Sequence, residues 1–181
     1  GGIQVHWYAM WFVVGLWALF VLVQRRLVEA GIFESSEQSE RFVFWGIVVT
    51  LVSAKLGFLL IYWWPFGQTG LPHQGLALPG MSFFGGLVGA IAYLLWFCAR
   101  NKKAVLGITD TVVLFVPLAI FCGRVGSFFQ AELLGRVTAV PWGMYFPGQV
   151  VLRHPSTLYA AVLEGVLVGC IVWMAALYPQ K

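Results

Sequence analysis

The sequence predicts an all-α integral membrane protein, a polytopic bundle of about five transmembrane helices, with residues 1–181 as a single transmembrane domain. Of the 181 residues, 60% are hydrophobic and only 10% are charged, and the mean hydropathy is +0.85. That composition has too few polar side chains to cover a soluble globule. The hydrophobic residues gather in runs that approach the roughly 20 residues needed to span a bilayer. These runs lack the polar and apolar alternation of barrel strands, so helices are expected to satisfy their backbone groups in lipid.

The five apolar runs are the expected helices, and in chain order they are Trp7–Val23, Phe42–Trp64, Met81–Ala99, Ile108–Cys122 and Leu158–Leu177. Aromatic residues open the first run and close the second, where such rings favour headgroup depth at a membrane surface. The fourth run is short and is expected to continue past Arg124. Pro155, shortly before the fifth run, suits the start of a helix.

The third run opens with a glycine-rich stretch that allows two interpretations. Gly85 and Gly89 have small-xxx-small spacing, which favours close packing of two helices. Alternatively, the glycines leave room for a lipid headgroup and expose N–H groups of the helix N-terminus to an anion. The two interpretations are compatible.

Lysine and arginine decide the expected orientation. The loops after the first and third runs carry six of the 11 Lys and Arg residues, and the loop after the second run carries none. The six are Arg25, Arg26, Arg41, Arg100, Lys102 and Lys103. By the positive-inside rule, these two basic loops lie in the cytoplasm. The N-terminus and the segment Gly123–Ser156 are then expected outside, and the C-terminus in the cytoplasm.

Several classes of partner and site are disfavoured. The formal net charge of +4 comes mostly from the basic loops, where it sets topology and attracts anionic headgroups, so nucleic acid is not an expected partner. Cys98, Cys122 and Cys170 lie in apolar runs without CxxC spacing, and we expect buried, inert thiols. The three histidines are too scattered to predict a metal site, and no cofactor is expected.

The most informative stretch is Gly123–Arg136, which follows the fourth run and carries two arginines and a glutamate. Ionisable groups at or near membrane depth are costly and mark a substrate site by default. Lys55 and Glu164 lie at similar depth within the second and fifth runs, and we expect them to form, or help to form, a buried pair.

A further polar group precedes the fifth run. Arg153, His154 and Ser156 flank Pro155 at the expected outer mouth of the helix. Capping and interfacial anchoring explain these side chains as well as a direct functional role does.

Four motifs, taken in order, resemble the prolipoprotein diacylglyceryl transferase family across nearly the whole chain. They are His6-Trp7-Tyr8, Gly80-Met81-Ser82-Phe83 with Gly85-Gly86, Gly123-Arg124 through Glu132 and Gly135-Arg136, and Arg153-His154-Pro155-Ser156 with Leu158-Tyr159. Four ordered matches are much more specific than any one of them.

The resemblance implies an enzyme of the bacterial cytoplasmic (inner) membrane that acts at its outer face. Members of the family transfer the diacylglyceryl group of phosphatidylglycerol to the lipobox cysteine thiol of a prolipoprotein and release glycerol phosphate. The implied partners are phosphatidylglycerol, or a related anionic phospholipid, and a lipobox-bearing prolipoprotein signal peptide. Such chemistry needs a thiolate, a phosphate clamp and a cavity open to lipid.

The resemblance also implies site residues. Arg124 and Arg136 are expected to grip phosphate, because guanidinium matches it bidentately, while Glu132 orients one of them. His154 is the fourth catalytic candidate. The expected substrate-binding residues are His6, Tyr8, Gly80, Ser82, Gly85, Gly86, Gly123, Gly126, Ser127, Gly135, Arg153 and Ser156.

The chain departs from the family pattern at several positions. Phe84 stands where the family has a histidine proposed as base, Ser127 replaces an asparagine, and Lys55 replaces an arginine. The sequence ends at Lys181 after five spans, so we expect a divergent member with a shortened C-terminus.

These departures keep two alternatives open. Phe84 and Ser127 favour a catalytically degenerate relative that binds lipid or serves as a subunit of a membrane complex. The intramembrane Lys55 and Glu164 would also suit a small transporter or channel.

Overall fold

The computed structural model describes residues 7–63, 80–131 and 133–178, and within them it is all-helical. Five helical stretches are long and apolar enough to cross a membrane: Trp7–Glu29, Ser36–Ile61, Phe83–Asn101, Val105–Gln130 and Ser156–Leu177. Each overlaps one of the expected runs, and the fourth continues past Arg124, as predicted. The protein is therefore a multi-pass, all-α membrane protein, whereas the sides of the membrane on which its ends lie stay a prediction.

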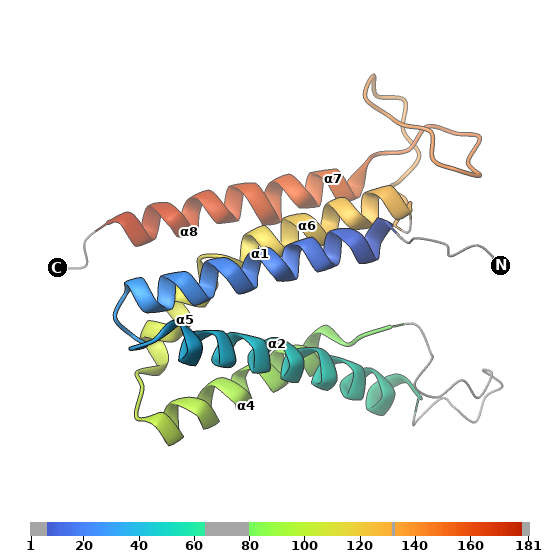
Figure 1. The fold of residues 1–181 in the computed structure, drawn as a ribbon. Helices are drawn as coiled ribbons and strands as arrows, with labels where there is room; N and C mark the ends of the chain where they lie inside the picture. Colours follow the sequence, from blue (N-terminus) through green and yellow to red (C-terminus); the bar gives the residue numbers. More distant parts are fainter. Residues whose placement is uncertain (1–6, 64–79, 132, 179–181) are drawn as a thin grey trace. The chain divides into compact units, whose positions relative to one another are not determined.

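The secondary-structure elements are, in order, α1 (Trp7–Glu29), α2 (Ser36–Phe58), η1 (Leu59–Trp63), α4 (Phe83–Asn101), α5 (Val105–Val113), α6 (Val116–Gln130), α7 (Ser156–Ala160), η3 (Ala161–Leu167) and α8 (Val168–Leu177). The elements η1 and η3 are π-helical. Figure 1 shows α7 and α8 drawn as parts of one continuous rod, so the fifth span is a single helix with a π-helical middle.

Side-chain caps explain where two of the spans begin. Ser35 precedes α2, and its hydroxyl accepts a hydrogen bond from the Gln38 N–H at 3.3 Å. Ser82 does the same for α4, accepting from the Gly85 N–H at 3.2 Å. Each serine satisfies one of the N–H groups that a helix start leaves without an intrahelical partner.

The fourth span is interrupted between α5 and α6. Pro117 lies in the first turn of α6, and its missing N–H and fixed ring do not allow a regular helix to run through this point. The indole N–H of Trp173 on α8 donates to the Leu114 carbonyl oxygen at 3.1 Å. A side chain from the fifth span thus satisfies a backbone group that the interruption exposes within an apolar span.

Two compact units divide the chain. One comprises Leu27–Ile108, and the other comprises Gly1–Arg26 with Thr109–Lys181. Each unit is described by itself below.

In the unit Leu27–Ile108, α2 and α4 run antiparallel and lie side by side (Figure 1). Glycine makes their approach possible, because a Cβ built on Gly85 would lie 2.7 Å from the Ser53 carbonyl oxygen and 2.9 Å from the Gly57 Cα. Stacked and tilted aromatic rings hold the other end of the pair, with Phe42 and Phe97 centroids 4.6 Å apart. The predicted close packing through glycine is therefore confirmed.

In the other unit, α6 lies against both α1 and the fifth span. A Cβ on Gly126 would come within 3.0 Å of the Trp11 Cβ, and one on Gly165 within 2.6 Å of the Phe121 Cβ. The rings of Trp11 and Phe129 stack with centroids 6.1 Å apart. Figure 1 shows α1, α6 and α8 drawn alongside one another.

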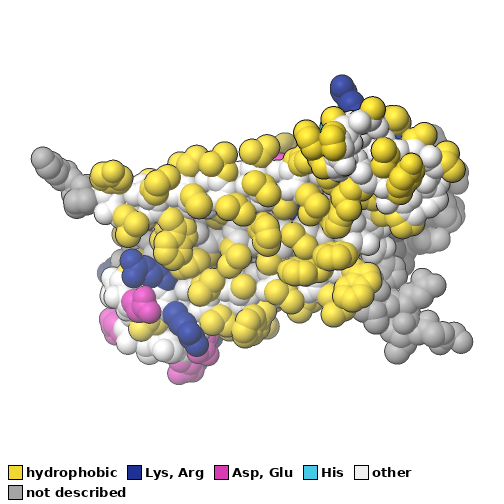
Figure 2. Space-filling view, turned by 90° about the horizontal axis from the view of Figure 1, so that it is seen from above, with side chains coloured by type: hydrophobic (Ala, Val, Ile, Leu, Met, Phe, Trp, Pro, Cys, Tyr) yellow, Lys and Arg dark blue, Asp and Glu magenta, His cyan; other side chains and the backbone are white. Residues whose placement is uncertain are grey.

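Most of the helical surface is apolar. In Figure 2, hydrophobic side chains cover most of the visible helical faces, and most of the visible charged side chains gather in one area. Large side chains such as Trp17, Val13 and Leu60 are exposed. Such surfaces suit hydrocarbon rather than water.

Candidate substrate site around Arg124

An ion pair joins α6 of the fourth span to η3 of the fifth span. Arg124 donates to a single carboxylate oxygen of Glu164, Oε2, from Nε at 2.9 Å and from Nη2 at 2.7 Å. The side chains are 36% and 46% exposed, respectively. Both groups are thus partly withdrawn into the protein, while one edge of the pair stays open.

Local structure places the two charges at matching depths. Arg124 lies six residues before Gln130, the last residue of α6, and Glu164 lies eight residues after Ser156, the first residue of α7. With a rise of 1.5 Å per residue, Arg124 lies about 9 Å from the C-terminal end of α6, and Glu164 lies about 12 Å from the N-terminal end of α7. A π-helical stretch, which often occurs at functional sites, carries Glu164.

The Glu164 carboxylate has Arg124 as a partner, which depth in the membrane alone did not predict. Lys55 donates to the Gly80 carbonyl oxygen at 3.5 Å and lies over the Phe58 ring. Lys55 and Glu164 belong to different units, and their expected pairing stays a prediction.

A folded segment connects α6 to α7. The helix α6 ends at Ala131, which has the left-handed φ of 51°. Beyond it, Val137 and Met144 each form an isolated antiparallel bridge with Arg153. The His154 N–H donates to the Arg136 carbonyl oxygen at 3.0 Å, so backbone pairing brings the two ends of this segment together.

Arg153 holds this segment together from within. Its Nε donates to Gln149 Oε1 at 2.9 Å, and its Nη1 donates to the Gly135 carbonyl oxygen at 3.0 Å. Gly135 is required here because a Cβ would approach the His154 carbonyl carbon to 3.0 Å. The structure thus gives Arg153 and Gly135 an architectural part in shaping the segment.

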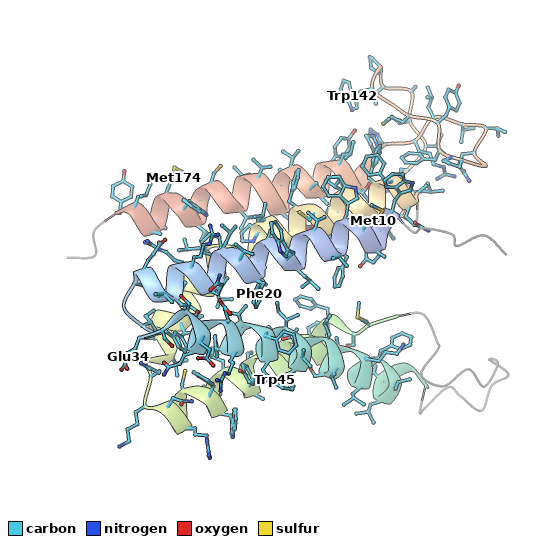
Figure 3. The ribbon with its side chains drawn as sticks, viewed as in Figure 1. Met10, Phe20, Glu34, Trp45, Trp142 and Met174 are labelled. Carbon is cyan, nitrogen blue, oxygen red and sulfur yellow. The ribbon has the colours of Figure 1, made fainter. Side chains whose placement is uncertain are left out.

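Three side chains form a hydrogen-bonded row beside it. The Trp142 indole N–H donates to the Tyr159 hydroxyl oxygen at 2.7 Å, and His154 Nδ1 lies 3.1 Å from the same oxygen. Figure 3 shows Trp142 in the connection that precedes α7. The row fixes the orientation of the His154 ring, and neither Trp142 nor the Tyr159 hydroxyl was predicted as a contributor.

The remaining predicted residues of α6 have distinct surroundings. Gly126 packs against Tyr8 and Trp11 of α1, and Ser127 is buried, whereas a Cβ on Gly123 would meet nothing within 4 Å. Gly123, the residue that precedes Arg124 in the sequence, therefore has open space where a side chain would stand.

Other predicted residues lie elsewhere or outside the described range. Gly80, Ser82, Gly85 and Gly86 belong to the unit Leu27–Ile108, where Ser82 caps α4 and the glycines face α2. Arg136 has an exposed side chain, and the Ser156 N–H donates to the His154 carbonyl oxygen at 2.8 Å. His6 and Glu132 lie outside the described residues.

The cysteines partly correct the sequence-based expectation. Cys98 and Cys122 are buried as expected, but Cys170 of α8 is exposed. Within residues 7–63, 80–131 and 133–178, no cluster of three or more His, Cys, Asp or Glu could hold a metal ion.

The pair Arg124–Glu164 is suited to binding an anionic group. The contact with Glu164 uses Nε and Nη2, so Nη1 on the far edge of the guanidinium faces away from the carboxylate oxygen. An arginine held in this way presents preoriented donors to phosphate oxygens. The fixed partner also reduces the entropy lost on binding.

Comparison with known proteins bears on what this site does. A sequence model of the prolipoprotein diacylglyceryl transferase family matches residues 1–181. The phosphatidylglycerol–prolipoprotein diacylglyceryl transferase of Pseudomonas entomophila is 36% identical over 193 residues, which cover 99% of this chain and 69% of the relative. Proteins of the same name from Coxiella burnetii and Pseudoalteromonas atlantica are 38% and 37% identical, and the matches cover 67% and 64% of their lengths. The chain therefore spans about two thirds of the length of these relatives.

Proposed function

Since this chain belongs to the prolipoprotein diacylglyceryl transferase family, we propose that it transfers the diacylglyceryl group of phosphatidylglycerol to the cysteine thiol of a prolipoprotein. The relatives carry both substrates in their names. The proposed location is the bacterial inner membrane, with the reaction at its outer face. The single observation that carries the assignment to a site is the Arg124–Glu164 pair within the membrane spans.

The reaction is a displacement at carbon. The thiolate sulfur of the prolipoprotein attacks the glyceryl carbon that carries the phosphate ester, and a carbon–sulfur bond forms as the carbon–oxygen bond breaks. Glycerol phosphate leaves with the electron pair of that bond, and the thiol proton passes to a base. Negative charge thus grows on the departing phosphate, which is where an enzyme gains most from fixed positive groups.

Arg124 is the group proposed to stabilise that charge. Glu164 restrains Nε and Nη2 of the guanidinium, so the side chain does not need to reorganise as the carbon–oxygen bond breaks. Glu164 is thus the positioning residue in this proposal. Glu132, which the sequence suggested for that role, lies outside the described residues.

His154 is the proposed proton acceptor. If Nδ1 carries the proton and donates to the Tyr159 oxygen, then Nε2 is left with a lone pair that can receive the thiol proton. Phe84, 71% exposed at the start of α4, has no titratable group and cannot act as the proton acceptor. The thiol proton therefore passes to another group or to solvent.

The other predicted residues complete the proposal. Arg136, with its exposed side chain, supplies a second positive group for the lipid phosphate. Gly123, where a Cβ would meet nothing within 4 Å, is proposed to leave room for the lipid headgroup. The remaining predicted substrate-binding residues, namely His6, Tyr8, Gly80, Ser82, Gly85, Gly86, Gly126, Ser127, Gly135, Arg153 and Ser156, stay predictions for shaping the lipid slot and the entry of the signal peptide.

The test is a reconstituted transfer assay. The purified protein in nanodiscs that contain phosphatidylglycerol is incubated with a lipobox peptide, and mass spectrometry detects the diacylglyceryl thioether. Product is expected, and Arg124→Ala should abolish it while the matched variant Arg25→Ala, at an exposed arginine near the end of α1, should not. Absence of product with phosphatidylglycerol still bound would overturn the enzyme assignment in favour of a lipid-binding relative.

A further inference from the structure

A groove separate from the Arg124 site lies between α2 and α4. Its volume is about 680 Å³, within the roughly 300–1,000 Å³ typical of small-ligand sites. Arg41, Trp45 and Val49 of α2 line one side, and Gly89, Trp96 and Arg100 of α4 line the other. It lies wholly within the unit Leu27–Ile108.

The side chains change along the groove in a fixed order. On α2, Arg41, Trp45 and Val49 follow one another at intervals of four residues, which places them on one helix face. On α4, which runs antiparallel, Arg100 and Trp96 repeat that order in reverse. The groove is thus basic at its end and aromatic one turn further in.

The end of the groove farthest from Arg41 and Arg100 is apolar. Val49 and Gly89 line it, and the nearby Ser53 hydroxyl is already used, because it donates to the Val49 carbonyl oxygen at 2.7 Å. The Tyr93 hydroxyl on the wall likewise donates to the Phe42 carbonyl oxygen at 3.1 Å. These internal bonds leave an apolar lining for a hydrocarbon chain.

We propose that this groove binds one anionic phospholipid of the surrounding bilayer. The lipid phosphate lies between Arg41 and Arg100, its glycerol and ester region lies beside Trp45 and Trp96, and one acyl chain extends toward Gly89. The order of chemistry along the groove is the order found across a membrane leaflet from headgroup to hydrocarbon. Figure 3 labels Trp45, one of the aromatic residues of α2.

Charge selects an anionic lipid over a zwitterionic one. Two arginines line the groove, and no Asp or Glu is among its described lining residues. Arg41 also forms an ion pair with Glu37, but these side chains are 72% and 73% exposed, so that pair is weak and leaves Arg41 available to phosphate. Arg100 has no acidic partner among the described residues, and a guanidinium suits phosphate better than an ammonium does.

The site is independent of the proposed transferase chemistry. Basic pockets between membrane helices are known to hold anionic headgroups, and this one contains none of the predicted catalytic residues. The backbones of α2 and α4 touch at Gly57 and Gly85. The bound lipid would bridge the two helices at their other end.

The experiment counts the lipid that the purified protein retains. Every variant carries Arg124→Ala, so that the proposed substrate site is weakened equally in all of them. Each protein is reconstituted in a phosphatidylcholine–phosphatidylglycerol mixture in which phosphatidylcholine predominates, and then extracted in mild detergent and examined by native mass spectrometry. The test variant is Arg41→Gln with Arg100→Gln, and the charge-matched control is Arg25→Gln with Lys102→Gln, neither of which lines the groove.

The test variant is expected to retain roughly thirtyfold less phosphatidylglycerol than the control, because each arginine contributes about a fivefold preference. Ala92→Trp, which fills the groove and keeps both arginines, should also displace the lipid and serves if the double variant does not fold. Equal retention of phosphatidylglycerol by the test variant and the control would overturn the proposal. Retention of phosphatidylcholine in place of phosphatidylglycerol by the control would also overturn it. Continued retention by Ala92→Trp would overturn it as well.

Discussion

Replacing Glu164 with glutamine tests whether this residue positions Arg124 for catalysis. Glutamine keeps the length of the side chain and one acceptor oxygen, but it loses the charge that holds Nε and Nη2. Hydrogen bonds between charged groups contribute about 1.5–3 kcal/mol. Because the two side chains are 36% and 46% exposed, we take the lower value, about 1.5 kcal/mol, as the expected loss.

That loss corresponds to roughly a tenfold fall in kcat/KM, since 1.36 kcal/mol changes a rate constant tenfold. The transfer assay in nanodiscs, with phosphatidylglycerol and a lipobox peptide, measures it. Most of the fall should be in kcat, because the restrained guanidinium matters when charge develops on the leaving phosphate. Arg124→Ala should cost more, on the order of a hundredfold or greater, as expected when a group that contacts the developing anion is removed.

Glu34→Gln is the matched control, because Glu34 is exposed in the connection between α1 and α2 (Figure 3). It should behave as the unaltered protein. If Glu164→Gln also retains full activity, or if it lowers activity by the same factor when Arg124 is already alanine, then the two residues act independently and the positioning role is wrong.

Three further predictions concern packing, the connection before α7 and the proposed base. Gly85→Val should lower the melting temperature through overpacking of about 1–3 kcal/mol, whereas Gly123→Ala, with open space around it, should not; equal losses would contradict the packing account. Trp142→Phe and Tyr159→Phe remove the same 2.7 Å hydrogen bond, so each should cost about 0.5–1.5 kcal/mol in unfolding free energy, and a double variant that loses the full sum would argue against a shared bond. His154→Gln should lower kcat by about 10²–10⁴ with retained lipid unchanged, and an unaltered kcat would assign proton transfer to another group.

Composition and run length were enough to predict the fold class. Each span could be placed from its hydrophobic run because the bilayer sets its length, and Ser35 and Ser82 cap helices in the way that their residue type suggests. The interruption before α6 was less visible, because a run of apolar residues continues through it. Pro117 was the available signal, and the position of Trp173, 56 residues later, could not be predicted from it.

The sequence indicated which charged residues stand out within the spans, but it did not indicate which side chains they contact. Arg124 and Glu164 were both recognised as costly charges within the spans, yet their ion pair was not predicted. Depth in the membrane follows from counting residues, whereas the partner depends on how each helix is rotated about its axis, and close packing at Gly165 against Phe121 decides that. Arg153 illustrates the same limit, because its role in bonding to Gly135 and Gln149 depends on a folded connection without regular strands.

The hydrogen bond between Trp173 and the Leu114 carbonyl oxygen predicts that the residues at positions 173 and 117 covary. With Pro117 in place, the indole supplies a donor that the backbone cannot, and in hydrocarbon an unsatisfied carbonyl is costly. A change of Pro117 to a residue with an N–H would allow an unbroken helix and make the indole dispensable. Trp173 and Pro117 are therefore expected to be exchanged together among related sequences, and loss of the tryptophan alone should be selected against.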